Sequence, residues 1–154
     1  CLRLSGGGRS CDCVGAMRVA LIDADDVVVN LVVADEGYTH PTYTVIDTDG
    51  APVEIGDYYD PDADVFVTPQ FEIDAPNTIP NDGTAVAVAV TTTARSEQSA
   101  TFEAADYTET ITVTPTSTIQ RDISTSVAAG STIDVRVSNG DIEPGRAVIE
   151  VTAP

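Results

Sequence analysis

Residues 133–138 read Ile-Asp-Val-Arg-Val-Ser, and this strict alternation of apolar and polar residues decides the fold class. Successive side chains of a β-strand point to opposite faces of a sheet, so the pattern predicts a strand with one buried face. The same period of two recurs at Val86, Val88 and Val90, at Ile111 and Val113, and at Ala147, Ile149 and Val151. No segment sustains the period of an amphipathic helix. The sequence therefore predicts an all-β protein.

The second half of the chain has the strand spacing of a sandwich. With segments 100–103 and 119–127 included, it holds about six predicted strands at a spacing of roughly ten residues. We therefore expect a β-sandwich domain at residues 84–154.

The first half predicts a small β-meander domain over residues 17–75. Turn residues such as Asp-Thr-Asp-Gly at 47–50 separate its short apolar runs. The expected strands are 19–22, 27–34, 43–46, 53–56 and 65–67. Residues 27–34 are almost entirely apolar, so we expect this strand to be covered on both faces or buried against a partner.

Two boundaries divide the chain. Residues 76–83 are expected to be a short linker, because Pro76, Pro80 and an Asn-Asp-Gly turn cannot continue a helix or a central strand. Residues 1–16 hold all three cysteines and carry a net charge of +1, against −19 for the remainder. We expect an N-terminal arm there, with Arg3 and Arg9 as partner-binding residues.

The formal net charge of −18 comes from 25 acidic residues against seven arginines, without any lysine. This charge repels phosphate groups, so we expect neither a nucleic-acid partner nor docking on an anionic membrane. The chain has no apolar run near the roughly 20 residues of a spanning helix. Residues 1–16 also lack the apolar stretch of a secretory signal. A salty habitat or the solubility of a crowded assembly also accounts for the charge.

Asp60, Asp62 and Asp64 mimic the first ligands of a calcium loop, in which alternate oxygens surround one hard cation. Val65 stands where such a loop needs glycine, and Phe71 where it needs a bidentate glutamate. We therefore interpret this segment as a solvated turn and keep the three aspartates as candidates for an adventitious cation. No metal or other cofactor is predicted.

The sequence lacks catalytic signatures. His40 is the single imidazole, and neither a Gly-x-Ser-x-Gly elbow nor a nucleotide-binding glycine loop is present. One residue separates Cys11 from Cys13, whereas a zinc site uses two to four. We expect a protein without enzymatic activity.

The aromatic residues concentrate in the first domain, at Tyr38, Tyr43, Tyr58, Tyr59 and Phe66. Tyrosine offers a large contact area at low entropic cost, so the four tyrosines are candidates for a protein-binding or carbohydrate-binding surface. The competing interpretation is that these rings fill a small core that lacks tryptophan.

Residues 17–68 resemble a small module of phage virion and tail-region proteins. The resemblance begins with Met, a basic residue and Val-Ala-Leu-Ile at 17–22, and continues with Val-Val-Asn-Leu-Val-Val-Ala-Asp at 28–35. It closes with Gly-Ala-Pro-Val-Glu-Ile-Gly-Asp-Tyr-Tyr-Asp at 50–60 and the aromatic Phe66. Pro61 replaces the glycine that usually follows the final Tyr-Asp. The resemblance implies a structural role in a phage particle and no catalytic residues.

Residues 82–154 are similar to bacterial and phage immunoglobulin-like domains. The similarity rests on Asp-Ile-Glu-Pro-Gly at 141–145 and Arg-Ala-Val-Ile-Glu-Val-Thr-Ala at 146–153. It implies an immunoglobulin-like sandwich. Such domains occur on capsids, tail tubes and adhesins alike, so the fold does not choose among these locations.

These expectations favour a capsid decoration or cement protein on the outer surface of a virion. Its arm and first domain would bind the major capsid protein and copies of the chain itself, as a trimer, while the acidic second domain keeps the protein soluble. A tail-fibre or tail-tip component is the first alternative. The second is a cell-surface adhesin-like module whose tyrosines bind a host-surface glycan.

Overall fold

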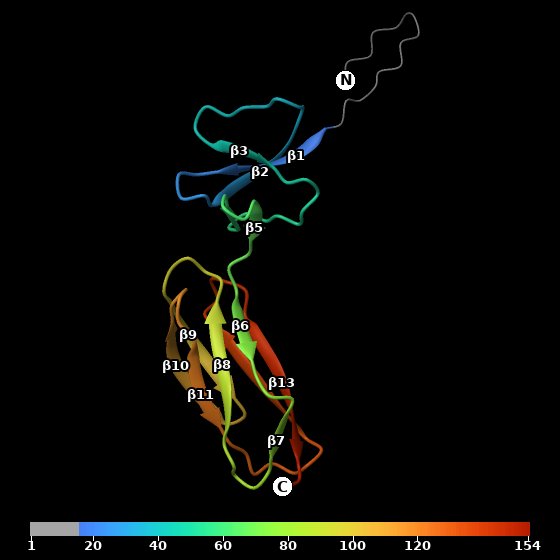
Figure 1. Cartoon of the computed structure of the whole chain (residues 1–154), viewed down its shortest axis with the longest axis vertical. Coiled ribbons are helices and arrows are strands. Elements are labelled where there is room, and N and C mark those ends of the chain that lie inside the picture. The colour runs from blue at the N-terminus through green and yellow to red at the C-terminus, as the bar shows by residue number, and fades with distance from the viewer. Residues whose placement is uncertain (1–15) are drawn as a thin grey trace, which may run out of the picture. The chain divides into compact units, whose positions relative to one another are not determined.

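The computed structural model describes residues 16–154, and Figure 1 shows their arrangement. These residues form thirteen β-strands and no helix. The predicted all-β fold class is confirmed. Residues 1–15, which include Arg3 and Arg9 and nearly all of the predicted arm, lie outside the described part of the chain.

The chain divides into two compact units between Phe66 and Val67. This division lies before the linker expected at 76–83, because the strands on both sides of Pro76 pair within the second unit. β6 (Phe71–Asp74) pairs with β8 (Val86–Thr92), and β7 (Thr78–Pro80) pairs in parallel with β13 (Gly145–Thr152). Prolines are tolerated there because β7 is a short strand at a sheet edge. Residues 76–83 therefore belong to the second unit.

The first unit is built on a three-stranded antiparallel sheet with β1 at its centre. β1 (Met17–Ile22) pairs with β2 (Val28–Ala34) on one side and with β3 (Thr44–Asp47) on the other. β4 (Tyr58–Asp60) and β5 (Val65–Val67) form a separate two-stranded sheet. Both β2 and β3 are therefore edge strands of the three-stranded sheet.

The buried core cluster of the first unit is small and consists of Ala20, Ile22, Val28 and Val53, and Val19 and Leu21 of β1 are buried as well. Half-buried side chains pack against it from Leu31, Ile46, Ala51, Tyr59 and Phe66. The strand predicted at 53–56 is wrong, because these residues form a loop that ends in a turn. The main chain of this loop bonds locally and to the start of β2. The Glu54 N–H donates to the Asp57 carboxylate at 2.8 Å, and the Gly56 N–H donates to the Val28 carbonyl at 2.9 Å. The loop thus supplies Val53 to the core without joining the sheet.

β2 is less covered than its apolar sequence predicts. Its first residue, Val28, is buried, but Val33 near its end is 74% exposed. Pairing on the outer side of β2 is seen at its start, where the Val28 N–H donates to the Asp57 carbonyl at 2.8 Å and Val27 forms a bridge with Tyr58. Within residues 16–154, part of β2 is therefore left uncovered.

The second unit is a sandwich of two sheets (Figure 1). The three-stranded sheet has the order β11-β8-β6, and the five-stranded sheet has the order β10-β9-β12-β13-β7. The remaining strands are β9 (Gln98–Ala104), β10 (Tyr107–Val113), β11 (Ile119–Ile123) and β12 (Thr132–Ser138). This order is consistent with an immunoglobulin-like sandwich.

The alternating residues of the second unit form its core. Ile133, Val135 and Val137 are buried, whereas Asp134 and Arg136 between them are exposed. Fifteen buried residues make up this core, far more than in the first unit. The sandwich therefore has a hydrophobic core of its own.

Candidate functional site

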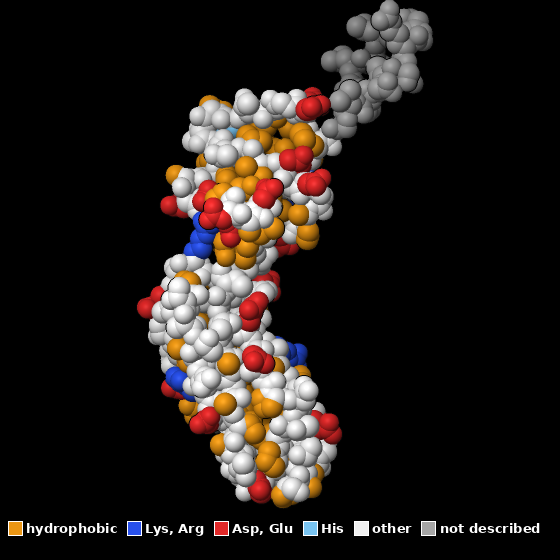
Figure 2. Space-filling view, in the orientation of Figure 1, with side chains coloured by type: hydrophobic (Ala, Val, Ile, Leu, Met, Phe, Trp, Pro, Cys, Tyr) orange, Lys and Arg blue, Asp and Glu red, His pale blue; other side chains and the backbone are white. Residues whose placement is uncertain are grey.

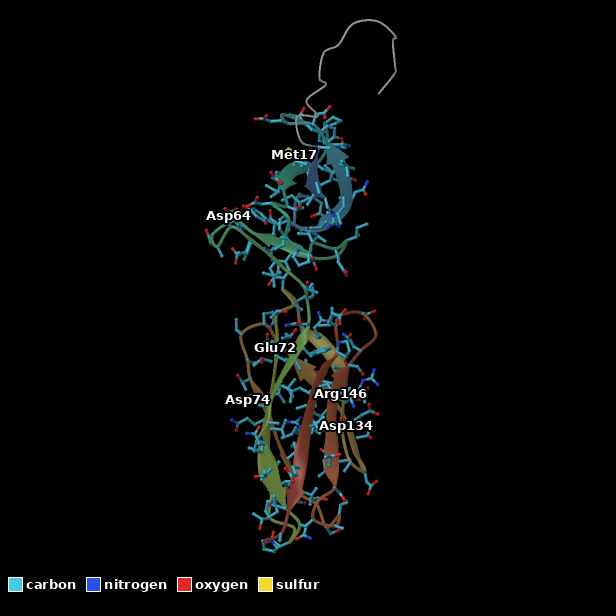
Figure 3. All side chains as sticks on the ribbon, turned by 90° about the vertical axis from the view of Figure 1, so that its right-hand side faces the viewer. Met17, Asp64, Glu72, Asp74, Asp134 and Arg146 are labelled. Carbon is cyan, nitrogen blue, oxygen red and sulfur yellow. The ribbon has the colours of Figure 1, made fainter. Side chains whose placement is uncertain are left out.

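The first unit contains an open pocket of about 830 Å³ beside the edge strand β3. Residues 45–51 line one part of it, and Tyr59, Asp64, Val65 and Phe66 of the β4–β5 hairpin line the other. Figure 3 shows Asp64 at the projecting end of this hairpin. The pocket thus combines a strand edge, a turn and a hairpin tip.

Three aspartates give the pocket its negative charge, and local turn geometry positions them. The Asp47 carboxylate accepts a hydrogen bond from the Asp49 N–H at 2.9 Å, which fixes the turn after β3. Asp49 and Asp64 have positive φ angles of 45° and 55°, a conformation that aspartate adopts more readily than most residues. The side chains of Asp47, Asp49 and Asp64 therefore line the pocket as a result of the turns that they form.

Two aromatic rings supply the apolar part of the pocket. The Tyr59 and Phe66 centroids lie 5.2 Å apart with tilted planes. The Tyr59 hydroxyl donates a hydrogen bond to the Asp64 carboxylate at 2.5 Å, and this bond raises the pKa of Tyr59 above its ordinary value. Carboxylate acceptors beside aromatic faces suit a cationic or a hydroxyl-rich ligand.

The three aspartates proposed as cation candidates are not brought together. The Asp60 carboxylate accepts hydrogen bonds from the N–H groups of Asp62 at 3.0 Å and Ala63 at 3.3 Å, so it shapes the turn between β4 and β5. Asp64 is turned to Tyr59 instead. Within residues 16–154, no group of three or more histidine, cysteine, aspartate or glutamate side chains is placed to hold a metal ion.

The four candidate tyrosines have different environments. Tyr38 is 40% exposed, and the half-buried Tyr43 stacks on His40 at 5.0 Å. His40 Nδ1 accepts hydrogen bonds from the Thr42 and Tyr43 N–H groups at 3.2 and 3.3 Å, so this imidazole stabilises its own loop. Tyr58 is half-buried beside β2, and Tyr59 alone of the four lines the pocket. Arg3 and Arg9, the other candidate binding residues, lie outside the described residues.

The second unit has a smaller pocket, of about 430 Å³, on its five-stranded sheet. Asp134, Arg136, Pro144 and Arg146 line it, and Figure 3 shows Asp134 and Arg146 on neighbouring strands. The Arg146 guanidinium donates to both Asp134 carboxylate oxygens, at 3.0 and 2.8 Å, and lowers the pKa of Asp134. Both side chains are more than half exposed, so solvent and salt screen this pair.

Sequence reasoning missed Asp47, Asp49 and Phe66 as residues of one site. The Asp-Thr-Asp-Gly segment predicts a turn, which the structure confirms, and Phe66 fits either a core or a surface position. An unusual density of aspartates in turns next to aromatic residues was the available signal. It does not reveal which turns meet in the fold.

Comparison with known proteins adds no identity to these observations. The chain matches no protein-family model, no curated protein and no solved structure. The described residues contain no helix with the length and hydrophobicity that a membrane crossing needs.

Proposed function

We propose that the chain is a non-enzymatic accessory protein of a phage-like particle, a decoration or cement protein that binds the major capsid protein on the outer surface of the shell. One observation carries this proposal: the first unit has six buried apolar residues, four of them in one packed cluster, whereas fifteen buried residues cluster in the core of the second. A unit with so small a core gains stability when a partner covers its remaining apolar surface. The first unit is therefore the part that attaches.

Exposed apolar side chains support attachment through the first unit. Val33, Ile55 and Val65 are 74%, 65% and 46% exposed. Figure 2 shows hydrophobic and acidic side chains intermixed on the visible face of this unit. Apolar contacts supply binding energy when a partner removes them from water, and the surrounding charge keeps the free protein soluble.

The second unit needs no partner for its stability, since its core is complete within the sandwich. In the proposed role it remains solvated, and its acidic surface limits aggregation of the particles. Copies of the chain would associate as a trimer on the shell.

Particles purified with and without this protein test the proposal. We expect particles that lack it to disassemble at lower temperature and in low-salt buffer, and we expect added full-length protein to restore their resistance. Gold-labelled antibody should mark the capsid in electron micrographs. Label on the tail would instead support a tail-fibre or tail-tip component, and unchanged particle resistance without capsid label would contradict the decoration role.

The pocket beside β3 favours one further candidate function, glycan binding, because aromatic faces and carboxylate acceptors are also suited to sugars. A glycan array with the full chain separates the two roles. Specific array binding that Tyr59→Ala abolishes would favour a host-surface glycan as the partner.

A further inference from the structure

Among residues 17–66, no basic side chain lines the acidic pocket beside β3. Arg18 is the one basic residue in 17–66, a segment that contains twelve acidic residues. Its guanidinium donates to the Val53 carbonyl at 2.9 Å, and Arg18 does not line the pocket. Asp47, Asp49 and Asp64 therefore line a pocket that receives no cationic side chain from residues 17–66.

The aromatic residues that line the pocket indicate which type of cation it would bind. Tyr59 and Phe66, whose rings lie 5.2 Å apart with tilted planes, line the pocket together with Asp64 at its hairpin end. A small hard cation prefers an all-oxygen cage, which the described acidic residues do not form. An arginine or lysine side chain uses both features, since its charge pairs with carboxylates and its stem or guanidinium plane packs on aromatic rings.

The strand edge indicates how such a side chain is presented. β3 pairs with β1 on one side, and among the described strands none pairs with its other side. Residues of β3 line the pocket, so an extended segment that adds to this edge would lie alongside the carboxylates. Such strand addition supplies main-chain hydrogen bonds, and a pocket beside it selects the side chain.

We propose that the pocket beside β3 binds an arginine or lysine side chain carried by an extended segment of a protein partner. The charge of the pocket, its paired aromatic rings and the free edge of β3 all fit this one occupant. This inference rests on the proposed function, because it requires a protein partner. The partner would offer a cationic, strand-like segment at the particle surface.

The test uses the full chain and the five-residue peptide acetyl-Thr-Val-Arg-Val-Thr-amide. Titration followed by ¹⁵N–¹H NMR should shift the amides of residues 45–51 and 64–66 with a dissociation constant in the millimolar range. The same peptide with citrulline in place of arginine has nearly the same shape without the charge. We expect it to bind at least about fivefold more weakly, because the carboxylates lose their charged partner.

Two double variants distinguish the effect of the pocket's own charges on peptide binding from the effect of the overall negative charge of the unit. Asp49→Asn with Asp64→Asn removes two charges from the pocket, and asparagine tolerates the positive φ at both positions. Asp35→Asn with Glu36→Gln removes two charges at exposed positions of the same unit that do not line the pocket. We expect the first pair to weaken binding of the arginine peptide about fivefold or more, and the second pair to change it less than about twofold.

Several results would overturn the inference: equal binding of the citrulline peptide, equal loss in the two double variants, or shifts scattered over the whole acidic surface. Stronger shifts of residues 45–51 with a neutral oligosaccharide would assign the pocket to glycans instead. Particle attachment is measured separately. If Asp49→Asn/Asp64→Asn loses peptide binding but still attaches to particles, the inferred site is contradicted and the proposed function stands. If the protein binds the peptide but does not attach to particles, the proposed function is contradicted and the inferred site stands.

Discussion

Glu109 and Arg121 form a bidentate ion pair between the two sheets of the sandwich. Arg121 Nε and Nη2 donate to the two Glu109 carboxylate oxygens at 2.7 and 3.3 Å, and the Tyr107 hydroxyl donates to the same carboxylate at 2.7 Å. Glu109 lies on β10 and Arg121 on β11, which are the terminal strands of their sheets. The pair therefore connects the edge strand of one sheet to the edge strand of the other.

This ion pair predicts a change in the acid stability of the second unit. Hydrogen bonds from Arg121 and then Tyr107 lower the pKa of Glu109 in the folded protein. Its stabilisation is complete above the unfolded glutamate pKa of about 4.3 and is lost as the pH falls through the lower folded value. We expect Glu109→Gln to reduce the thermal midpoint at neutral pH and to flatten its decline in acid.

Thermal melts followed by circular dichroism between about pH 6 and pH 3 measure this effect. Glu150→Gln is the matched control, since it removes one carboxylate from an exposed position of β13. The control should keep the acid slope of the wild-type protein. A Glu109→Gln slope that equals the wild-type slope would refute the stabilising role of the pair.

Truncation of a core ring should affect one unit and spare the other. Phe102 is fully buried in the core of the sandwich, so Phe102→Ala is expected to destabilise the second unit by about 3–5 kcal/mol. Val53→Ala is the corresponding change in the core of the first unit. In calorimetry, each variant should move its own transition. A common shift of both transitions in either variant would show that the units unfold as one.

Gly145 is predicted to be intolerant of any side chain. A Cβ at this position would lie 2.9 Å from the Phe71 carbonyl oxygen, which belongs to the main chain of β6 and cannot move freely. We expect Gly145→Ala to cost about 1–3 kcal/mol in urea denaturation, because β6 must shift from β13. Gly140→Asn, in open space with a positive φ of 84°, should change stability by less than about 0.5 kcal/mol. Equal losses in both variants would contradict a steric cause at Gly145.

Salt should stabilise the first unit. Twelve acidic residues face a single arginine over residues 17–66, so repulsion among like charges opposes the compact state. Raising sodium chloride from about 0.05 to 0.5 M shortens the Debye length and should raise the melting temperature of this unit. Potassium chloride should act equally, since screening does not depend on the cation. A melting temperature that is unchanged or lower in both salts would contradict the repulsion.

The fold was most predictable where strands bury one face. The alternation at 133–138 identifies both the strand and its buried residues, because a period of two has no other common structural origin. Residues 53–56 misled the prediction, since the apolar Val53 is buried from a loop whose amides bond locally and to the first residue of β2, without forming a strand. Pro76 and Pro80 misled the placement of the boundary, because edge strands accept proline.

The candidate site was less predictable than the fold. The sequence marks Tyr59 as one of several aromatic candidates, and it groups Asp64 with Asp60 and Asp62 by the spacing of a calcium loop. In the structure Asp64 instead joins Asp49, which is fifteen positions earlier in the sequence, at one pocket. Contacts between separate turns depend on sheet pairing, and local spacing does not encode them.

The partly uncovered β2 has a consequence for handling the protein. Residues 28–34 form a seven-residue stretch of high strand propensity without charge or proline, the kind of segment that seeds fibrils when it escapes its native sheet. Aspartates and a glutamate flank it on both sides, at 23–26 and 35–36, and act as gatekeepers against such pairing. We expect concentrated samples of a variant that lacks these charges to scatter light as intermolecular β-structure accumulates.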